Sequence, residues 1–345
     1  MLHEAISALH IKPQGTYVDA TFGRGGHSAL ILQSLGPTGR LIAFDRDPQA
    51  VAVGKNIRDE RFEIIHSPFS ALVAQLRERG VTEIDGILID LGVSSPQLDE
   101  ASRGFSFRQD GPLDMRMDPT HGVPISSWIA SASTNELKKV ISEYGEERFA
   151  FQIADAITTR CAAASRGEAS PLESTSALAD LVAETLRRYR ARKEPGKHPA
   201  TRTFQALRIF INNEIEELST VLEAAIKLLR ESGRIAVISF HSIEDRLVKQ
   251  CFRHYAGKSA PIVSRSVTSA QRAMIGSIQQ TLSDGLSGQS IAPCLKLMTR
   301  IRPSNEEVAR NPRARSATLR VAERVASRTR KSMNFRSDAL EKGVR

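Results

Sequence analysis

The sequence predicts an α/β fold in which a mostly parallel sheet of seven strands is interrupted by a block of helices. Three observations predict it. Short β-branched runs alternate with helical stretches between Gly15 and Gly92, a long region without that alternation follows, and the strand pattern returns towards the end. Strand–helix–strand units of this kind form parallel strands joined by right-handed crossovers.

The first part of the chain supplies four strands, each a short run rich in β-branched and apolar residues. They are predicted at residues 16–21, 40–45, 61–66 and 85–91. The three stretches between them, 27–36, 48–59 and 70–80, carry apolar residues at helical spacing, and two of them end in glycine, as helices often do.

After Leu91 the periodicity disappears. Residues 92–123 are rich in Gly, Pro, Ser and Asp, which predicts a long ordered loop or a lid. Helical segments follow, one opened by Ser133-x-x-Glu136 and another by Ser170-Pro171-x-Glu173, both typical of helix N-termini. We therefore expect a helical insertion at 106–200.

The strand pattern resumes after the insertion. Residues 203–233 form a long amphipathic helical region broken near its middle, and 233–240 has the composition of a fully buried strand. Segments 294–301 and 316–323 are predicted as a terminal antiparallel pair. The sheet domain is therefore expected to comprise 1–105 and 201–325, with a flexible basic tail at 326–345.

Composition excludes several classes of protein. No window approaches the ~20 apolar residues of a membrane helix, and the start, MLHEAISALHIKP, lacks a signal for export. Cys161, Cys251 and Cys294 are far apart, which fits a reducing compartment and no cysteine-based zinc site. We expect a cytoplasmic protein that binds neither membrane nor metal.

Positive charge is concentrated in two segments. The net charge is +9, yet residues 187–202 carry seven basic residues and one acid, and 310–345 carry eleven basic residues and three acids. Such segments can neutralise phosphates, so a nucleic-acid partner is expected. Arg187, Arg188, Arg190 and Arg192 are the candidate phosphate contacts; the alternative is a solvated charged face with a disordered tail.

The first strand runs into a glycine-rich turn, Gly23-Arg24-Gly25-Gly26-His27, followed directly by a helix. Glycines allow a sharp turn and a helix N-terminus offers free N–H groups, while Asp45, at the end of the second strand, can hydrogen-bond ribose hydroxyls. A dinucleotide would use similar geometry, but the turn departs from G-x-G-x-x-G and no hydride machinery follows.

Two further positions follow the third and fourth strands. Phe69 can lie against a flat adenine ring, although a phenylalanine is more often part of a core. Asp90 ends the fourth strand, beside the point where ligands gather in such sheets. A carboxylate there is costly unless it binds something, which favours a functional role.

At these residues the sequence resembles the MraW family of 16S ribosomal RNA methyltransferases. The matching stretches run from near the start to about Arg324. They are YVDATFGRGGHS, FDRDPQA, IDGILIDLGVSSPQLDEASRGFSFRQDGPLDMRMDP, HPATRTFQALRIFINNE, GRIAVISFHSIEDRLVK and NPRARSATLRVAER. The family pattern places a short His-containing segment before its first helix, and this sequence, starting at MLHEA, departs from it there.

The resemblance implies a Rossmann-like class I methyltransferase fold and S-adenosyl-L-methionine as the methyl donor. It implies methylation of N4 of the cytosine conventionally numbered 1402 in 16S rRNA, within the small ribosomal subunit. The implied donor contacts are Gly25, Gly26, His27, Asp45, Phe69, Asp90 and Gln97.

The acceptor side is a hypothesis from the residues. Many amino methyltransferases carry an Asn/Asp-Pro-Pro-aromatic tetrapeptide after the fourth strand, where this chain has Asp90-Leu91-Gly92-Val93. We expect Asp90 or nearby carbonyls to accept the N4 hydrogens, with residues 239–242 opposite and His241 as a positioning or proton-accepting group. A structural His241 is an equal alternative.

Phe105 and Phe107, in the long loop, are candidates to sandwich an unstacked base; the alternative is packing of the insertion. Two other functions compete with methyl transfer: a donor-sensing RNA-binding or assembly factor without catalysis, and a nicotinamide-dependent oxidoreductase. The sequence leaves the oligomeric state open, a homodimer included.

Overall fold

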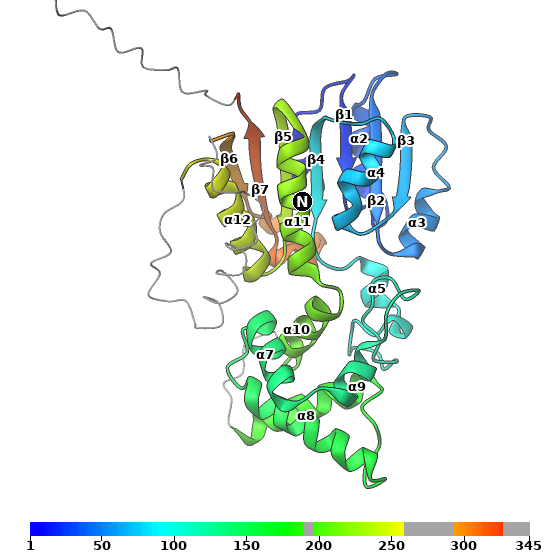
Figure 1. Cartoon of the computed structure of the whole chain (residues 1–345), viewed down its shortest axis with the longest axis vertical. Helices are drawn as coiled ribbons and strands as arrows, with labels where there is room; N and C mark the ends of the chain where they lie inside the picture. The colour runs from blue at the N-terminus through cyan, green and yellow to red at the C-terminus, as the bar shows by residue number, and fades with distance from the viewer. Residues whose placement is uncertain (190–195, 197, 259–292, 327–345) are drawn as a thin grey trace, which may run out of the picture.

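The computed structural model describes residues 1–189, 196, 198–258 and 293–326. It has two lobes, a sheet flanked by helices and a helical lobe at the carboxyl ends of the strands (Figure 1). Among the residues described, no helix is both long and apolar enough to cross a bilayer. The basic tail predicted at 326–345 lies, after Ala326, outside the described residues.

Seven strands form one sheet, in the order β3-β2-β1-β4-β5-β7-β6. The first five are parallel, and β7 is antiparallel to both β5 and β6, so the predicted strands and the terminal antiparallel pair are confirmed. The strands are β1 (Thr16–Asp19), β2 (Arg40–Asp45), β3 (Phe62–His66), β4 (Ile84–Asp90), β5 (Leu229–Ser239), β6 (Leu295–Ile301) and β7 (Thr318–Arg324).

Helices cover both faces of the sheet because alternate residues of its buried strands face opposite ways. In β4, Ile87 packs in the cluster with α4, α11 and α12, whereas Leu88 packs with α1 and α2 on the other face. The helices of the sheet lobe are α1 (Leu2–Leu9), α2 (Gly26–Ser34), α3 (Pro48–Gly54), η1 (Phe69–Ala71), α4 (Leu72–Glu78), α11 (Glu214–Leu228), α12 (Ser242–Tyr255), α14 (Asn305–Arg310) and η3 (Pro312–Ser316).

The helical lobe has its own apolar core. It contains α6 (Ile125–Ser131), α7 (Thr134–Gly145), α8 (Ala150–Ser165), α9 (Thr175–Arg188) and α10 (Thr201–Ile211). Helix α10 falls in the predicted sheet domain, but Phe204 and Leu207 bury their side chains in the core of the helical lobe. The lobe is joined to the sheet through residues 91–117 on one side and through Asn212–Asn213 on the other.

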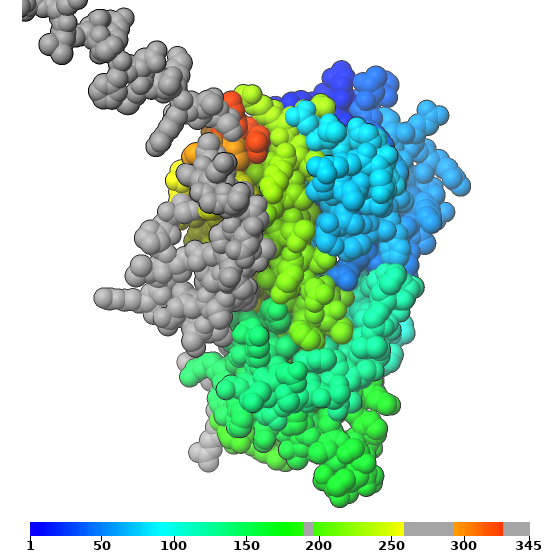
Figure 2. All heavy atoms as spheres, in the orientation of Figure 1, coloured from blue at the N-terminus to red at the C-terminus, as the bar shows by residue number. Residues whose placement is uncertain are grey.

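The predicted break in the helical region 203–233 is confirmed at Asn212–Asn213, between α10 and α11. The prediction is wrong at the end of that region, because α11 stops at Leu228 and residues 229–233 belong to β5. Asn213 has φ 51°, a left-handed conformation that asparagine tolerates better than most residues. In the space-filling view, α11 runs down the front of the sheet lobe and meets the helical lobe beneath it (Figure 2).

One predicted helix start is confirmed and one is wrong. Ser133 caps α7, and the Glu136 side chain accepts from the Ser133 backbone N–H at 2.9 Å, completing a capping box. No helix begins at Ser170, because α9 starts at Thr175 with Ser174 as its cap. The backbone of Glu173 is instead paired with Leu113, whose N–H donates to the Glu173 carbonyl at 2.7 Å.

The aperiodic segment 92–123 is ordered, as predicted, but it contains two short helical turns, α5 (Ser95–Asp99) and η2 (Ala101–Arg103). The first turn is too short to produce a periodic pattern. It is fixed by the Gln97 side chain, which accepts from the Ser94 backbone N–H at 2.9 Å.

Candidate functional site

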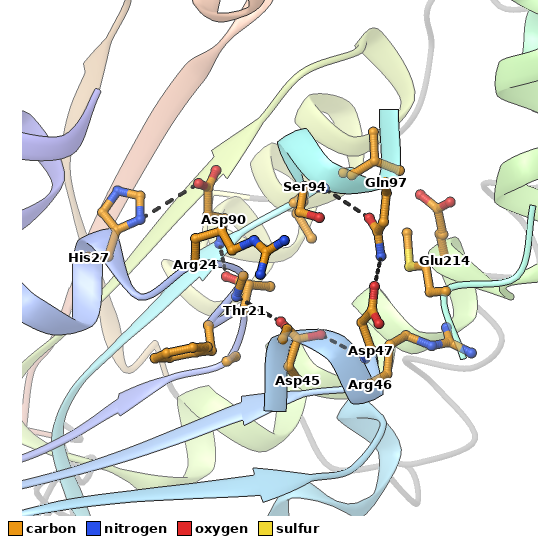
Figure 3. Close-up of a pocket in the computed structure, with 18 of the residues that line it drawn as sticks. Thr21, Arg24, His27, Asp45, Arg46, Asp47, Asp90, Ser94, Gln97 and Glu214 are labelled. Atoms are coloured by element: carbon orange, nitrogen blue, oxygen red, sulfur yellow. Dashed lines mark hydrogen bonds and ion pairs between the residues drawn. The ribbon is translucent and has the colours of Figure 1, made fainter. Parts of the chain in front are cut away.

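A cavity of about 380 Å³ opens at the carboxyl ends of the first five strands of the sheet. Its walls come from the turns after β1, β2, β3, β4 and β5, from the start of α11, from Asn311, the N-cap of η3, and from Arg313 of η3. Figure 3 shows polar side chains from these separate segments pointing towards one another. Parallel strands bring their chain reversals to one edge, which is where ligands bind in such folds.

The glycine-rich turn forms one wall of the cavity. Gly23 and Gly25 have φ of 55° and 77°, and Gly25 is the N-cap of α2. A side chain at Gly25 would collide with the Phe22 ring, since an ideal Cβ would lie 2.8 Å from it. The turn therefore exposes main chain and a helix N-terminus to the cavity, as the sequence predicts for a site that contacts a ligand closely.

Asp45 is the last residue of β2, and its carboxylate holds the glycine-rich turn through a hydrogen bond. Its Oδ2 accepts from the Gly23 N–H at 2.8 Å, and its Oδ1 accepts from the Asp47 N–H at 2.8 Å. Burial raises the pKa of Asp45, although these backbone donors oppose the change. The carboxylate lines the cavity, so it is placed to accept hydroxyl hydrogens from a ligand.

Asp90 is an acid of the cavity wall whose side chain is incompletely hydrogen-bonded. Its N–H donates to Thr21 Oγ1 at 2.7 Å, while its Oδ1 is buried and has no hydrogen-bond partner. Burial, followed by the nearby carboxylates of Asp19 and Glu244, raises the pKa of Asp90 to about 7. An acceptor that is buried and unsatisfied in the free protein is suited to a ligand that donates hydrogen bonds.

His27 faces Asp90 across the turn, with Nδ1 3.7 Å from Asp90 Oδ2 (Figure 3). Burial lowers the pKa of His27 to about 4, so the imidazole is neutral at pH 7 and the contact is not a full ion pair. Its Nε2 is also buried without a partner. Asp90 and His27, which both line the cavity, thus each retain a buried polar atom without a partner among the described residues.

A buried polar network adjoins the cavity wall, to which two of its members belong. It is formed by Asp47, Gln97, Arg103 and Asn212. Asp47 caps α3, and its Oδ2 accepts from Gln97 Nε2 at 2.8 Å and from Arg103 Nη1 at 2.9 Å. Gln97 lines the cavity, as the expected donor contact requires, but its amide also holds this network together.

The same network reaches both connections to the helical lobe. Arg103 Nη2 donates to the Met117 carbonyl at 2.9 Å, and Asn212 holds Met115 and Met117 through its side-chain amide at 2.7 and 2.8 Å. Arg46, next to Asp45, donates to the Asn212 carbonyl at 2.6 Å. The segment that contains Asp45 and Arg46 is therefore hydrogen-bonded to Asn212, the residue that follows the last helix of the helical lobe.

We expect Arg103→Ala to lower the free energy of unfolding by about 3–5 kcal/mol, because it leaves the buried Asp47 carboxylate without its counter-charge. Urea unfolding followed by circular dichroism measures this. Arg166→Ala is the control, since its ion pair with Glu168 is exposed to solvent and should contribute far less to stability than the buried pair. Equal losses in the two variants would show that the network contributes no more than a surface pair.

His241 lies outside the cavity wall, which includes its neighbours Phe240 and Glu244. It is the N-cap of α12: Nδ1 accepts from the Glu244 N–H at 3.4 Å, and Nε2 lies 2.9 Å from Glu244 Oε1. The structure thus supports the structural alternative for His241. Of the expected opposing wall at 239–242, Phe240 lines the cavity.

Phe105 and Phe107 do not line the cavity either, so the structure supports packing over a base sandwich. Phe105 is 7% exposed. Phe107 lies in the core of the helical lobe, with its ring centroid 4.8 Å from that of Phe204 and 4.6 Å from that of His198. Because Phe204 and His198 are far from Phe107 in the sequence, these contacts could not be predicted from it.

The predicted phosphate contacts are described in part. Arg187 and Arg188 are exposed in the last turn of α9, and Arg188 pairs with Glu184 on the same helix. Arg190 and Arg192 lie outside the described residues. Neither Arg187 nor Arg188 reaches the cavity, so any role would be in contacting a large ligand beyond it.

Several lining residues belong to no site motif that the sequence displays, among them Glu214, Glu217 and Arg313. Asp47 was not predicted either, although an Asp directly before a Pro at a helix start is a recognisable N-cap signal. Glu214, His241 and Glu244 bring donor atoms within 4.8 Å of one another, a grouping of the size that holds a metal. Arg208 already balances Glu214, with two contacts of 2.8 Å.

Comparison with known proteins gives matches along almost the whole chain. The sequence pattern of the MraW methylase family matches residues 1–325. The ribosomal RNA small subunit methyltransferase H of Burkholderia pseudomallei is 51% identical over 326 residues, which are 94% of this chain and 96% of the relative. The protein of the same name from Burkholderia thailandensis is 52% identical over the same shares.

Among solved structures, an rRNA methylase from Streptococcus thermophilus covers 94% of this chain and 94% of its own, at 12% identity and a TM-score of 0.37.

Proposed function

Because the chain belongs to the MraW methylase family, we propose that it transfers a methyl group from S-adenosyl-L-methionine to N4 of cytosine 1402 in 16S rRNA, in the cytoplasm. The observation that supports this most directly is the cavity itself, where the glycine-rich turn, Asp45 and the unsatisfied Asp90 meet. The relatives' name specifies small-subunit ribosomal RNA. Action on RNA within the small subunit is part of the proposal.

The residues present fit the donor. Asp45 would accept from the ribose hydroxyls, and Phe69 would lie against adenine. Gly26 and His27 line the cavity at the start of α2 and would hold the amino-acid end, while Gly25, the N-cap of α2, shapes the turn without lining the cavity. Phe69 is half-buried, with one side against the core, so its remaining surface faces the cavity. When bound, S-adenosyl-L-methionine supplies an electrophilic methyl carbon on a sulfonium.

Asp90 is the group we propose to act on the acceptor. The amino group of cytosine is a weak nucleophile because its lone pair is delocalised into the ring. Asp90 Oδ1 can accept one of the N4 hydrogens, which orients the amine, and a carboxylate whose pKa is about 7 can take that proton once N4 has gained a fourth bond.

For the RNA backbone we propose the basic segment 187–202, which begins in the last turn of α9. Combined replacement of Arg187, Arg188, Arg190 and Arg192 by alanine is expected to weaken binding to small-subunit RNA by about 10-fold or more and to lower the slope of log K against log[salt] by up to ~3, because four phosphate contacts are lost. Filter binding across a salt series measures both quantities.

The matched control is the pair Arg77→Ala and Arg166→Ala, two exposed positions on other segments. The control removes two charges and the variant removes four, so the slope changes are compared per charge removed. If that change is the same in both, the effect is one of total charge and the assignment to Arg187, Arg188, Arg190 and Arg192 is wrong.

The proposed reaction is tested by incubating the protein with methyl-labelled S-adenosyl-L-methionine and small-subunit RNA, free or assembled into subunits, followed by mass spectrometry of the nucleosides. The expected product is N4-methylcytidine, and Asp45→Ala is the control expected to yield none. Failure to label either substrate would favour an RNA-binding or assembly role without catalysis.

A further inference from the structure

Five neighbouring strands present their turns to the cavity in a definite spatial order. From β3 through β2, β1 and β4 to β5, these turns carry Phe69, Asp45, the glycine-rich turn, Asp90 and Phe240. Neighbouring strands lie about 4.8 Å apart, so the two phenylalanines follow strands separated by roughly 19 Å. One continuous cavity therefore has an aromatic side chain at each end.

The third phenylalanine of the cavity, Phe22, cannot serve as a platform. It is 3% exposed, and its ring lies directly beneath Gly25. Phe69 and Phe240 are both half-buried, each resting on a core cluster while lining the cavity. The donor contains one flat ring system, adenine, which Phe69 would meet beside Asp45. The exposed surface of Phe240 is left for a second ring.

Phe240 is held in place independently of any ligand. Its N–H donates at 2.9 Å to Oε2 of Glu244, a residue that is 2% exposed in the first turn of α12. Ring atom Cδ2 lies 3.5 Å from the position that a Cβ would take on Gly92. Gly92 follows Asp90 by two residues, so the Phe240 ring lies beside the end of β4, where Asp90 is proposed to accept a hydrogen bond from the target amine.

The segment Asp90-Leu91-Gly92-Val93 lacks the aromatic residue that ends the tetrapeptide of many amino methyltransferases. We propose that Phe240, which directly follows β5, is the platform on which the unstacked target cytosine lies, with its amino group towards Asp90. Every base has a flat face that stacks on an aromatic side chain, so Phe240 would hold the ring while Asp90 distinguishes the amino edge. This assignment rests on the proposed function.

The test compares Phe240→Leu with Phe69→Leu. For Phe240→Leu we expect the Kd of S-adenosylhomocysteine, measured by calorimetry, to stay within about twofold, and kcat/KM for RNA to fall about 10- to 100-fold, since base stacking is lost. For Phe69→Leu we expect the main effect on the donor site, with the Kd for S-adenosylhomocysteine raised about 10-fold. Phe240→Tyr keeps the ring and should keep kcat/KM within about threefold.

A second readout does not depend on turnover. Small-subunit RNA carrying pyrrolocytosine at the target position is expected to change fluorescence on binding to the wild type and to Phe240→Tyr, and to show little change with Phe240→Leu. Thermal unfolding confirms that each variant is folded. If Phe240→Leu does not fold, Phe240→Ile and Phe240→Tyr are compared in its place.

The outcomes separate the two proposals. A wild-type protein that methylates N4, together with a Phe240→Leu variant that matches it in kcat/KM and fluorescence, overturns the platform alone. Loss of S-adenosylhomocysteine binding in Phe240→Leu also overturns it, because the ring would then belong to the donor site. A wild-type protein that labels no RNA overturns the proposed function and the platform with it.

Discussion

Asp45→Ala is expected to raise the Kd of S-adenosylhomocysteine roughly 100-fold, because it removes the two charge-assisted hydrogen bonds, each worth about 1.5 kcal/mol, that we propose Asp45 makes to the ribose. The variant also releases Gly23, whose N–H donates to Asp45 in the free protein. Methylation at donor concentrations near the wild-type Kd should therefore become undetectable. Isothermal titration calorimetry gives the affinity directly.

Asp45→Asn separates the two contributions. An amide retains an acceptor for the Gly23 N–H but loses the negative charge and one acceptor position. We expect its affinity and its melting temperature to lie between those of the wild type and the alanine variant, because the Gly23 N–H keeps its acceptor while the Asp47 N–H loses its own. An alanine variant that binds S-adenosylhomocysteine as tightly as the wild type would show that Asp45 only shapes the turn.

Asp90→Asn is expected to lower kcat by about 100-fold or more, since general-base and orienting groups typically contribute at least that factor. Because the pKa of Asp90 is raised to about 7 in the free protein, wild-type kcat/KM should rise with pH through about 7 as the carboxylate ionises. The asparagine variant should lack this rise. Initial rates from pH 5.5 to 8.5 measure it.

The raised pKa of Asp90 also determines how the Asp90→Asn substitution should change the stability of the protein. The folded protein holds the Asp90 proton more tightly than the unfolded chain, so the contribution of Asp90 to stability is lost as pH rises from about 4 to about 7. Asp90→Asn should therefore raise the melting temperature of the donor-free protein at pH 8 relative to the wild type. A lower melting temperature at pH 8 would mean that the carboxylate has a stabilising partner in the folded protein.

The features of the fold that sequence predicted are those set by local pattern. The strands follow from β-branched runs, and the capping box at Ser133 and Glu136 follows from two side chains three residues apart. Asp45 and the glycine-rich turn were predictable because parallel strands place their ends at one edge whatever the details of packing.

What the sequence could not predict depends on contacts between distant residues. Ser170 has the composition of a helix cap, yet the pairing of Glu173 with Leu113 keeps that stretch extended. Phe107 and His241 are residue types that serve in active sites and in cores alike, and their neighbours decide between the two. Arg103 gave no signal, because its partner Asp47 lies 56 residues away.

The pairing of β4 with β5 across the helical lobe also determines how the protein is made. About 140 residues separate Asp90 from Leu229. Because translation adds roughly 5–20 residues per second, β5 is synthesised on the order of ten seconds after β4. During that interval one apolar edge of the growing sheet is unpaired and open to wrong partners. Autonomous folding of the helical lobe, which has its own core, would shorten the effective loop and bring β5 to that edge.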